Sequence, residues 1–438
     1  MVRKWIAGFI VACAPLTALC ETPAPPEPET WAVHGQVTNV TQGHPPFRSP
    51  YEGDNSLAAR GRTEETTDLT VYAGLAPWRG GEIWINPEID QGHGLSDTLG
   101  MAGFPSGEAY KVGANKPYAR LPRLFLRQTI ALGGDAQPVE AAANQLAGSH
   151  TADNLTLTVG KFGVVDVFDT NTYAHDPRMD FLNWSIIDSG SFDYAADAWG
   201  FTYGAAAEWT QGSCTARAGI FQMSRLPNGK IIKPDFSKFS AVAELEVRYA
   251  LGERGGKVKL LGFVNHAPMA RYRDAVALAQ ATGSTPDVAL VRHGANRPGM
   301  AVNVEQELRE DVGAFLRASA NDGKYEAYEF TEINRSIAAG VSIKGKRWTR
   351  DDDTFGIAGV MNTMSRDSCD YFAAGGLGIL IGDGALRYGS ERVVEVYYSA
   401  RVVRGVTVSL DYQRAENPAY NRDRGPVDLF AVRVHAEF

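Results

Sequence analysis

The sequence predicts an all-β fold: a transmembrane antiparallel up-and-down β-barrel of about 16 strands, with inward-folded loops constricting the lumen. Three observations predict it. Short segments of alternating apolar and polar residues recur along the chain, an export signal stands at the start, and the last residue is the aromatic Phe438. Beyond the export signal no stretch approaches about 18 consecutive apolar residues, so a membrane helix is not expected. A closed sheet is the other structure that pairs every backbone polar group in lipid.

The N-terminus has the order of features typical of a secretory signal peptide. Arg3 and Lys4 supply positive charge, and the apolar stretch 5–16 that follows is too short to span a bilayer. A polar, proline-rich run comes next. The chain is therefore divided into a signal peptide over residues 1–20, a Pro-rich N-terminal segment over 21–30 and an outer-membrane β-barrel over 31–438.

The alternation of apolar and polar residues is clearest in the last predicted strand. Apolar side chains share one parity and polar ones the other: Phe430, Val432, Val434, Ala436 and Phe438 against Arg433, His435 and Glu437. A strand places two such sets on opposite faces. A soluble sandwich alternates as well, but its apolar face points inward. Here the polar face is heavily charged and the apolar face is aliphatic, which favours a lipid-facing wall around a wet lumen.

Sixteen segments of this kind can be counted, an even number as such barrels require. They are expected to start near Trp31, Thr66, Glu82, Leu121, Asn154, Trp199, Cys214, Phe239, Lys257, Ala301, Val312, Asn334, Thr354, Val393, Gly405 and Val427.

Two connections are too long to be turns, Gly92–Arg120 and Gly163–Ala198, and both are predicted to fold into the lumen. The second is rich in Asp and Asn between Asp166 and Asp197. Calcium binding is one interpretation, but the spacing does not match an EF-hand loop, so turns and helix caps are favoured. The insert Tyr272–Ala281 has helical composition and is expected to form a short helix outside the sheet.

Composition excludes several classes of function. A formal net charge of −8 argues against a nucleic-acid partner. Removal of the signal peptide leaves Cys214 and Cys369, whose pairing stays open, and no spacing typical of metal ligands is present. Catalytic motifs are absent too, so neither an enzyme, a metal nor a cofactor is expected.

Two neighbouring segments gather charged and aromatic side chains on one face. In the first, Ile83, Ile85 and Ile89 share the outer face, and the inner face carries Glu82, Trp84, Asn86, Glu88 and Asp90. The second turns Leu124, Leu126 and Ile130 outward, and Arg123, Phe125 and Arg127 inward. If these strands pair, carboxylates and guanidinium groups meet on the lumen wall beside an aromatic ring.

Such a wall suits a sugar, because Arg donates and Glu and Asp accept hydrogen bonds while an aromatic face packs against the sugar ring. The candidate substrate-binding residues are Arg123, Arg127, Glu88, Trp84, Asn86, Asp90 and Trp184. The alternative is that these charges only solvate a pore and hold strand register. Trp184 and Trp199 equally fit a stacking platform and the core of the folded-in loop.

Four stretches resemble the carbohydrate-selective porins of the OprB type. They are residues 86–96 (NPEIDQGHGLS), 119–129 (ARLPRLFLRQT), 159–171 (VGKFGVVDVFDTN) and 180–185 (DFLNWS). The resemblance implies sixteen strands, inward-folded loops and a constriction lined by Arg, acidic and aromatic residues. By position, its basic constriction is similar to Arg123 and Arg127, with Glu88 and Trp184 as partners. The stretch between Ala270 and Pro298 is longer than in a minimal porin.

The expected function is therefore passive diffusion of mono- or small oligosaccharides across the bacterial outer membrane. The expected partners are small sugars and outer-membrane lipid, and a homotrimer and a monomer both fit. A general or anion-preferring channel is the alternative, followed by an outer-membrane enzyme or an adhesive barrel with a sealed lumen.

Overall fold

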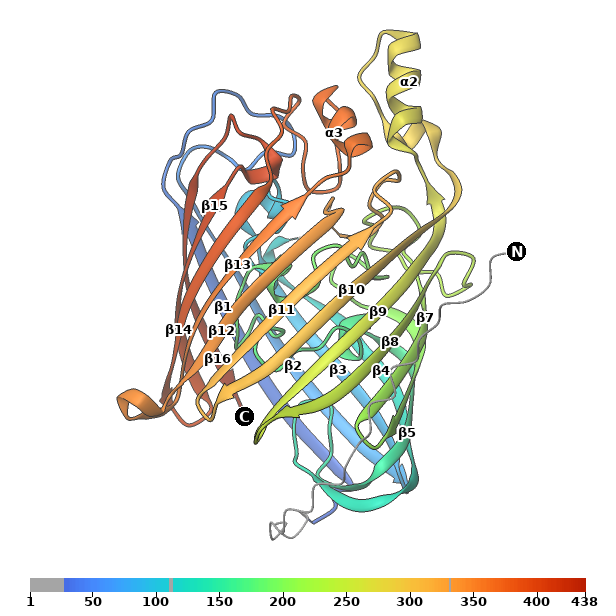
Figure 1. Ribbon diagram of the computed structural model, residues 1–438, viewed down its shortest axis with the longest axis vertical. Coiled ribbons are helices and arrows are strands. Elements are labelled where there is room, and N and C mark those ends of the chain that lie inside the picture. The colour runs from blue at the N-terminus through green and yellow to red at the C-terminus, as the bar shows by residue number, and fades with distance from the viewer. Residues whose placement is uncertain (1–26, 110–112, 331) are drawn as a thin grey trace, which may run out of the picture.

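The computed structural model describes residues 27–109, 113–330 and 332–438 (Figure 1). The predicted signal peptide and residues 21–26 of the Pro-rich segment lie outside the described residues. Within the described part of the chain no helix combines the length and apolarity needed to cross a bilayer.

Sixteen strands of the described chain close into one antiparallel barrel, in which each strand pairs with its sequence neighbours and β1 pairs with β16. The predicted fold class and strand number are confirmed. The strands are β1 Trp31–His44, β2 Arg62–Trp78, β3 Gly81–Gly92, β4 Ala114–Val139, β5 Gly148–Phe162, β6 Thr202–Gln211, β7 Cys214–Gln222, β8 Phe239–Leu251, β9 Arg254–Met269, β10 His293–Arg309, β11 Val312–Asn321, β12 Arg335–Gly345, β13 Arg350–Thr363, β14 Glu391–Val403, β15 Val406–Glu416 and β16 Val427–Glu437.

Most strands begin within a few residues of the predicted positions, and β4 and β10 differ most. They start at Ala114 and His293 instead of near Leu121 and Ala301. Both early stretches contain a proline, Pro117 and Pro298, and mix polar with small residues, so their alternation is weak. The first long connection consequently ends earlier than predicted.

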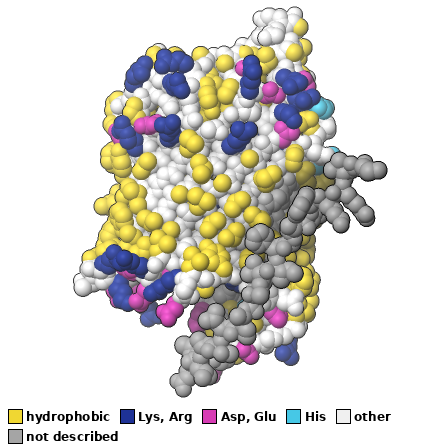
Figure 2. Space-filling model, viewed as in Figure 1, with side chains coloured by type: hydrophobic (Ala, Val, Ile, Leu, Met, Phe, Trp, Pro, Cys, Tyr) yellow, Lys and Arg dark blue, Asp and Glu magenta, His cyan; other side chains and the backbone are white. Residues whose placement is uncertain are grey.

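The two faces of the wall follow the predicted parity. On β8, Leu245 is 44% exposed while Glu244 is 3% exposed, and on β16 the outward Val432 is 43% exposed while Arg433 is buried. Figure 2 shows the result on one face: an apolar belt lies between bands of Lys and Arg near both ends of the barrel. The apolar side chains therefore cover the outside of the barrel, as in barrels that sit in a bilayer, and the charged ones face the lumen.

The two ends of the barrel differ in their connections. Tight turns join β2 to β3, β6 to β7 and β14 to β15, and we call this the short-turn end. Long connections occupy the opposite end, including the helices α2 (Tyr272–Thr282) and α3 (Arg366–Ala373), which stand above the rim in Figure 1. The predicted helix over Tyr272–Ala281 is thus confirmed. In bacterial outer-membrane barrels short turns face the periplasm and long loops face outward.

Short helical elements lie in the connections. They are α1 Trp184–Ile187 and the 3₁₀ turns η1 Leu95–Thr98, η2 Val164–Asp166, η3 Val288–Val291, η4 Lys346–Trp348 and η5 Pro418–Tyr420. Cys214 starts β7 at the short-turn end, whereas Cys369 lies in α3 at the other end. Both cysteines are free, which settles the pairing that the sequence leaves open.

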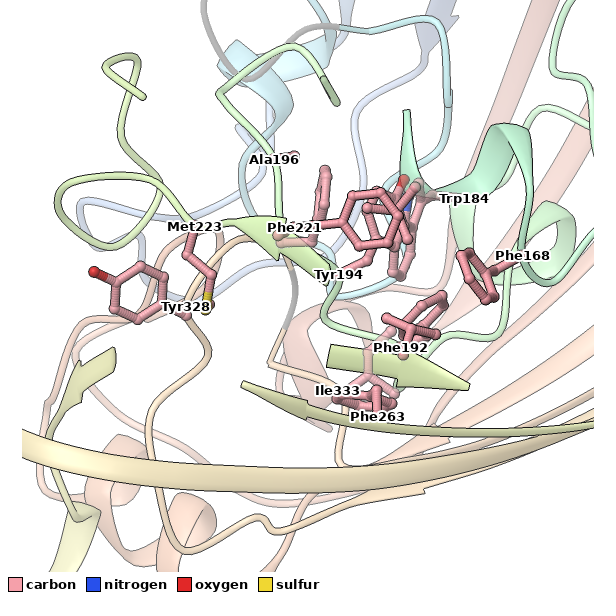
Figure 3. Packing of buried hydrophobic residues seen from close by; sticks show 14 of the residues in the cluster. Phe168, Trp184, Phe192, Tyr194, Ala196, Phe221, Met223, Phe263, Tyr328 and Ile333 are labelled. Atoms are coloured by element: carbon pink, nitrogen blue, oxygen red, sulfur yellow. The ribbon is translucent and has the colours of Figure 1, made fainter. Parts of the chain in front are cut away.

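The connection 163–201 fills much of the lumen, as predicted. Its aromatic residues pack among themselves and against inward-facing residues of the wall (Figure 3): Phe192 lies 5.0 Å from Phe263 of β9, and Phe168 lies 5.9 Å from Phe221 of β7, between ring centroids. All four side chains are buried. The barrel interior is therefore partly a solid apolar core rather than an open tube.

Carboxylates hold the backbone of both inward loops. Glu395 of β14 accepts hydrogen bonds from the backbone N–H of Leu182 and of Asn183, while Glu391 accepts from the N–H of Ala102 and of Gly103. A buried N–H without a partner costs about 1–3 kcal/mol, so these contacts fix where the loops run. The described residues 93–109 of the first connection are thereby also placed inside the barrel.

The lipid-facing assignment of β16 can be tested at Val432, the middle residue of that strand. A Val432→Arg substitution is expected to lower the free energy of unfolding by about 2–4 kcal/mol, because a charge near the bilayer midplane loses its hydration. Urea titration of the barrel refolded in liposomes measures it. Val432→Thr, which adds no charge, is the matched control. Equal stability of the two variants would contradict a lipid-facing position.

Candidate substrate-binding site in the lumen

A cavity of about 1570 Å³ runs inside the barrel beside β3, β4 and β5. It extends from the inward loops to the short-turn end, where Arg79 and Gly80 of the β2–β3 turn line it. The predicted residues Arg123, Arg127 and Trp184 line this cavity. Arg123 and Arg127 come from β4, and Trp184 comes from an inward loop whose backbone is hydrogen-bonded to Glu395 of the wall.

Two arginines of β4 share one aromatic ring. Arg123 donates two hydrogen bonds to the carboxylate of Asp166, at 2.8 and 2.6 Å, and its guanidinium lies 4.7 Å from the Phe201 ring centroid. Arg120 lies 5.1 Å from the same centroid and 5.8 Å from that of Trp199. All three distances lie within the range of cation–π contacts.

Burial alone would raise the pKa of the Asp166 carboxyl, but the adjacent Arg123 guanidinium holds it below its ordinary value. The carboxyl therefore remains an acceptor across the neutral range.

Alternation in the sequence misses Arg120. It lies an odd number of residues from Arg123, so strict alternation would put the two on opposite faces. The strand pairing shows why both face inward: Asn86 is opposite Arg123 and Glu88 is opposite Arg120, so β4 has one extra residue there. Such a bulge resets the parity. Pro122 within it, which donates no backbone hydrogen bond, is the one sequence feature that could have signalled it.

Four predicted residues of β3 point inward but lie behind the lining. Trp84, Asn86, Glu88 and Asp90 are each at most 2% exposed. Glu88 and Asp90 both pair with Arg120. The structure thus brings the predicted carboxylates together with an arginine, although with Arg120 and not with Arg123.

Trp84 is held on both sides. Its indole N–H donates to the Glu82 carboxylate at 2.7 Å. Its ring lies over the backbone of Gly74 on β2, where a Cβ atom would come within 2.5 Å of the ring. The ring is therefore part of the wall packing and has no free face.

Arg127 makes different contacts from Arg123. Its guanidinium lies 3.6 Å from the Glu82 carboxylate and donates to the backbone oxygen of Asn144 at 2.7 Å. Asn144 lies in the β4–β5 turn. The two arginines that the sequence groups together therefore serve different parts of the channel.

Trp184 stacks against two other aromatic rings. Phe104 from one inward loop and Phe330 from the β11–β12 connection lie 5.4 and 5.7 Å away, nearly parallel to the indole. The side chain is only 3% exposed. This packing supports the interpretation of Trp184 as part of the core of the inward loop.

The inward loops add charges that no strand pattern predicts. Arg178 of the second loop lies 3.4 Å from Glu108 of the first and 3.9 Å from Asp68 of β2. Burial raises the pKa of Glu108 to about 8, despite the nearby guanidinium. These residues meet only because two loops distant in sequence fold into one lumen.

Among the described residues, the cavity lining holds five arginines and eight acidic residues. They are Arg79, Arg120, Arg123, Arg127 and Arg178, with Glu29, Glu82, Glu108, Asp166, Asp176, Asp188, Glu208 and Glu437. Both signs are mixed and the acids are in excess. By formal charge, the lining is therefore not the ring of basic residues that is typical of an anion-selective pore.

A closed barrel with a lipid-facing wall, a charged lumen and inward loops defines an outer-membrane channel of the porin class. Residues 54–438 match the carbohydrate-selective porins of the OprB family, and the chain belongs to that family. It is thus a porin of the bacterial outer membrane and not an enzyme. The predicted family, class and location are confirmed.

Solved structures agree with this fold. The chain is similar to Pseudomonas putida OprB in its high-pH structure, with a TM-score of 0.70 and 14% identity over 93% of this chain and 94% of that one. The low-pH structure of the same protein gives a TM-score of 0.51 at 10% identity, covering 93% of each chain. The Acinetobacter baumannii outer-membrane channel DcaP gives 0.50 at 10% identity, covering 93% and 97%. A search of curated proteins gave no match.

The raised pKa of Glu108 predicts that the ion selectivity of the channel depends on pH. With a pKa of about 8, this carboxyl is mostly neutral at neutral pH and gains a negative charge as the pH rises through that value. The cation-to-anion permeability ratio is therefore expected to increase with pH, and to increase less in Glu108→Gln. Reversal potentials in a KCl gradient measure it.

Glu310→Gln, in the β10–β11 turn outside the cavity lining, is the control and is expected to keep the wild-type response. An unchanged response in Glu108→Gln would show that the carboxyl does not titrate in this range.

Proposed function

We propose that sugars are recognised on the cavity wall formed by Arg120, Arg123, Asp166, Trp199 and Phe201, which we call the β4 arginine site. The observation that carries this proposal is the placement of two guanidinium groups over one aromatic ring, at 4.7 and 5.1 Å, on the wall of a wide cavity. The channel then passes mono- and small oligosaccharides down their concentration gradient, without a chemical step.

The chemistry of a sugar matches each part of this site. A pyranose ring has apolar C–H faces, which pack against aromatic rings such as Trp199, and hydroxyl groups that both donate and accept. A guanidinium has five N–H donors, more than the pair with Asp166 engages, and that carboxylate has further acceptor capacity. Hydroxyls can therefore replace water on both partners as the sugar passes.

Recognition at this site has to be weak. A tightly bound sugar would leave slowly, and conduction requires a site that releases what it binds. The cavity volume of about 1570 Å³ exceeds the roughly 300–1,000 Å³ of a tight small-molecule site. A wide cavity with contacts on one wall suits passage rather than capture.

Four residues of β3 that the sequence places at the site are buried, and we propose that they hold other side chains in position and do not touch the sugar. Glu88 and Asp90 hold Arg120 at the wall by ion pairs, and Thr70 donates to Glu88 at 2.6 Å. Trp84 and Asn86 pack behind the lining. We assign these four residues to positioning and only Arg120 and Arg123, of the strand residues, to direct contact.

We propose that the transport path runs through a single barrel, because described residues of this chain line the cavity from the inward loops to the short-turn end. A monomer and each protomer of a homotrimer would therefore use the same path. The lipid partner is proposed to cover the aliphatic belt around the wall, and residues 1–20 are proposed to direct export.

Arg123 is the first residue to test. Arg123→Ala is expected to weaken the block of ion current by sugars, because the site loses donors and leaves Asp166 without its partner. Single-channel recordings with added glucose or a disaccharide measure the block. Arg366→Ala, in the exposed helix α3, is the matched control. Sugars are expected to block its ion current as they block that of the wild type. Unchanged block in Arg123→Ala would remove the β4 arginine site from recognition.

Selectivity for neutral sugars is tested by liposome swelling. Swelling is expected to be rapid in monosaccharides and slower in longer sugars, because the inward loops narrow the path. A series of mono-, di- and trisaccharides gives the size limit, with organic anions of similar size for comparison. Faster entry of the anions would favour an anion channel, and no swelling in any solute would indicate a sealed barrel.

A further inference from the structure

The β4–β5 hairpin is unlike the other short-turn connections. It is the lowest part of the barrel in Figure 1, because β4 continues to Val139 and β5 begins at Gly148. The pairing between these strands shifts register between Ala131 and Ala136. Gly133 and Gly134 lie there with φ of 143° and 80°, values that favour glycine. The hairpin therefore bends where it leaves the barrel wall.

The tip of this hairpin, residues 140–147, returns to the lumen. The guanidinium of Arg127, an inward-facing side chain of β4, donates to the backbone oxygen of Asn144 at 2.7 Å. Leu146 is 5% exposed and belongs to the apolar core of the lumen that includes Trp84 and Phe125. One hydrogen bond and one buried leucine thus anchor the tip beneath the cavity.

A second segment meets the tip from the other side. The N–H of Glu29 donates to the oxygen of Ala147 at 3.0 Å, and the N–H of Ala147 donates to the Glu29 carboxylate at 2.8 Å. The oxygen of Thr30 accepts from the N–H of Ala76 on β2 at 2.8 Å. Residues 28–30, which we call the strap, therefore connect β2 with the tip, past the intervening strands β3 and β4.

Both segments line the same cavity as the β4 arginine site. Pro28, Glu29 and Thr30 of the strap contribute to it, as do residues 143–147 of the tip. Glu82 lines it nearby and lies 3.6 Å from Arg127. The short-turn end of the cavity is thus bordered by folded-in chain rather than by the open rim of the barrel.

We propose that the tip and the strap form a second narrowing, the exit constriction, which sets the size limit at the periplasmic mouth. Arg127 is a positioning residue there, because its hydrogen bond to Asn144 holds the tip. The buried side chain of Leu146 anchors the tip in the apolar core of the lumen. Glu29 ties the strap to the tip and places a carboxylate at the mouth. The proposal rests on the channel function but not on sugar binding at Arg123.

Release of the tip tests this proposal. Arg127→Ala and Leu146→Ser are each expected to raise single-channel conductance and to admit longer oligosaccharides in liposome swelling, because the tip leaves the mouth. Block by glucose is expected to persist, since the β4 arginine site is intact. Wild-type conductance and size limit in both variants, with heat-modifiable migration on gels showing a folded barrel, would overturn the proposal.

Chemical modification gives a second test that does not depend on unfolding the tip. In a Cys214→Ser background, Ala143→Cys is expected to react with a charged thiol reagent added from the periplasmic side, with a fall in conductance. Asp135→Cys, on the exposed stretch of the same hairpin and outside the cavity lining, is the matched control and is expected to react without that fall.

Modification of Ala143→Cys that leaves the current unchanged would place the tip outside the conducting path and would overturn the proposal. These results can be distinguished from those at the β4 arginine site. Loss of the size limit reports on the exit constriction, whereas loss of glucose block reports on Arg123.

Discussion

Backbone hydrogen bonding inside the lumen is the constraint on which the rest of this structure depends. A closed sheet pairs its own N–H and C=O groups, so a loop that enters the barrel has to find partners among inward-facing side chains. Glu391 and Glu395 supply acceptors from the wall, and Asp193 supplies one from the loop, accepting from the N–H groups of the β11–β12 connection and from Arg297. Many inward acids are thus occupied in holding loops.

This division of work is consistent with the weak sugar binding proposed for the β4 arginine site. Charges such as Glu395 are buried against loop backbone, while Arg123 and Asp166 pair at the edge of the cavity. A bidentate ion pair resting on Phe201 presents donors and acceptors at fixed positions. A passing hydroxyl can exchange with water there without rearrangement of the wall.

The arginines of β4 show how far sequence reasoning reaches at a site. Alternation places Arg123 and Arg127 on the lumen face, and both lie there. Strict alternation would put Arg120 on the opposite face, but one extra residue in β4 resets the parity and turns Arg120 inward. It also gives Arg123 and Arg127 one role, although the first contacts Asp166 of a loop and the second holds the β4–β5 turn. The partners of these arginines lie in loops, and the path of a loop leaves no periodic pattern in the sequence.

The sequence by itself determined the wall: closed sheet, strand number and the side chains that face lipid. These follow from a period of two, repeated in every strand and enforced by the bilayer. Only the tertiary structure decided the lumen, where Arg178 meets Glu108, Phe330 covers Trp184 and Glu29 reaches Ala147. The partners in each of these contacts are distant in the chain, so closure of the barrel had to bring them together.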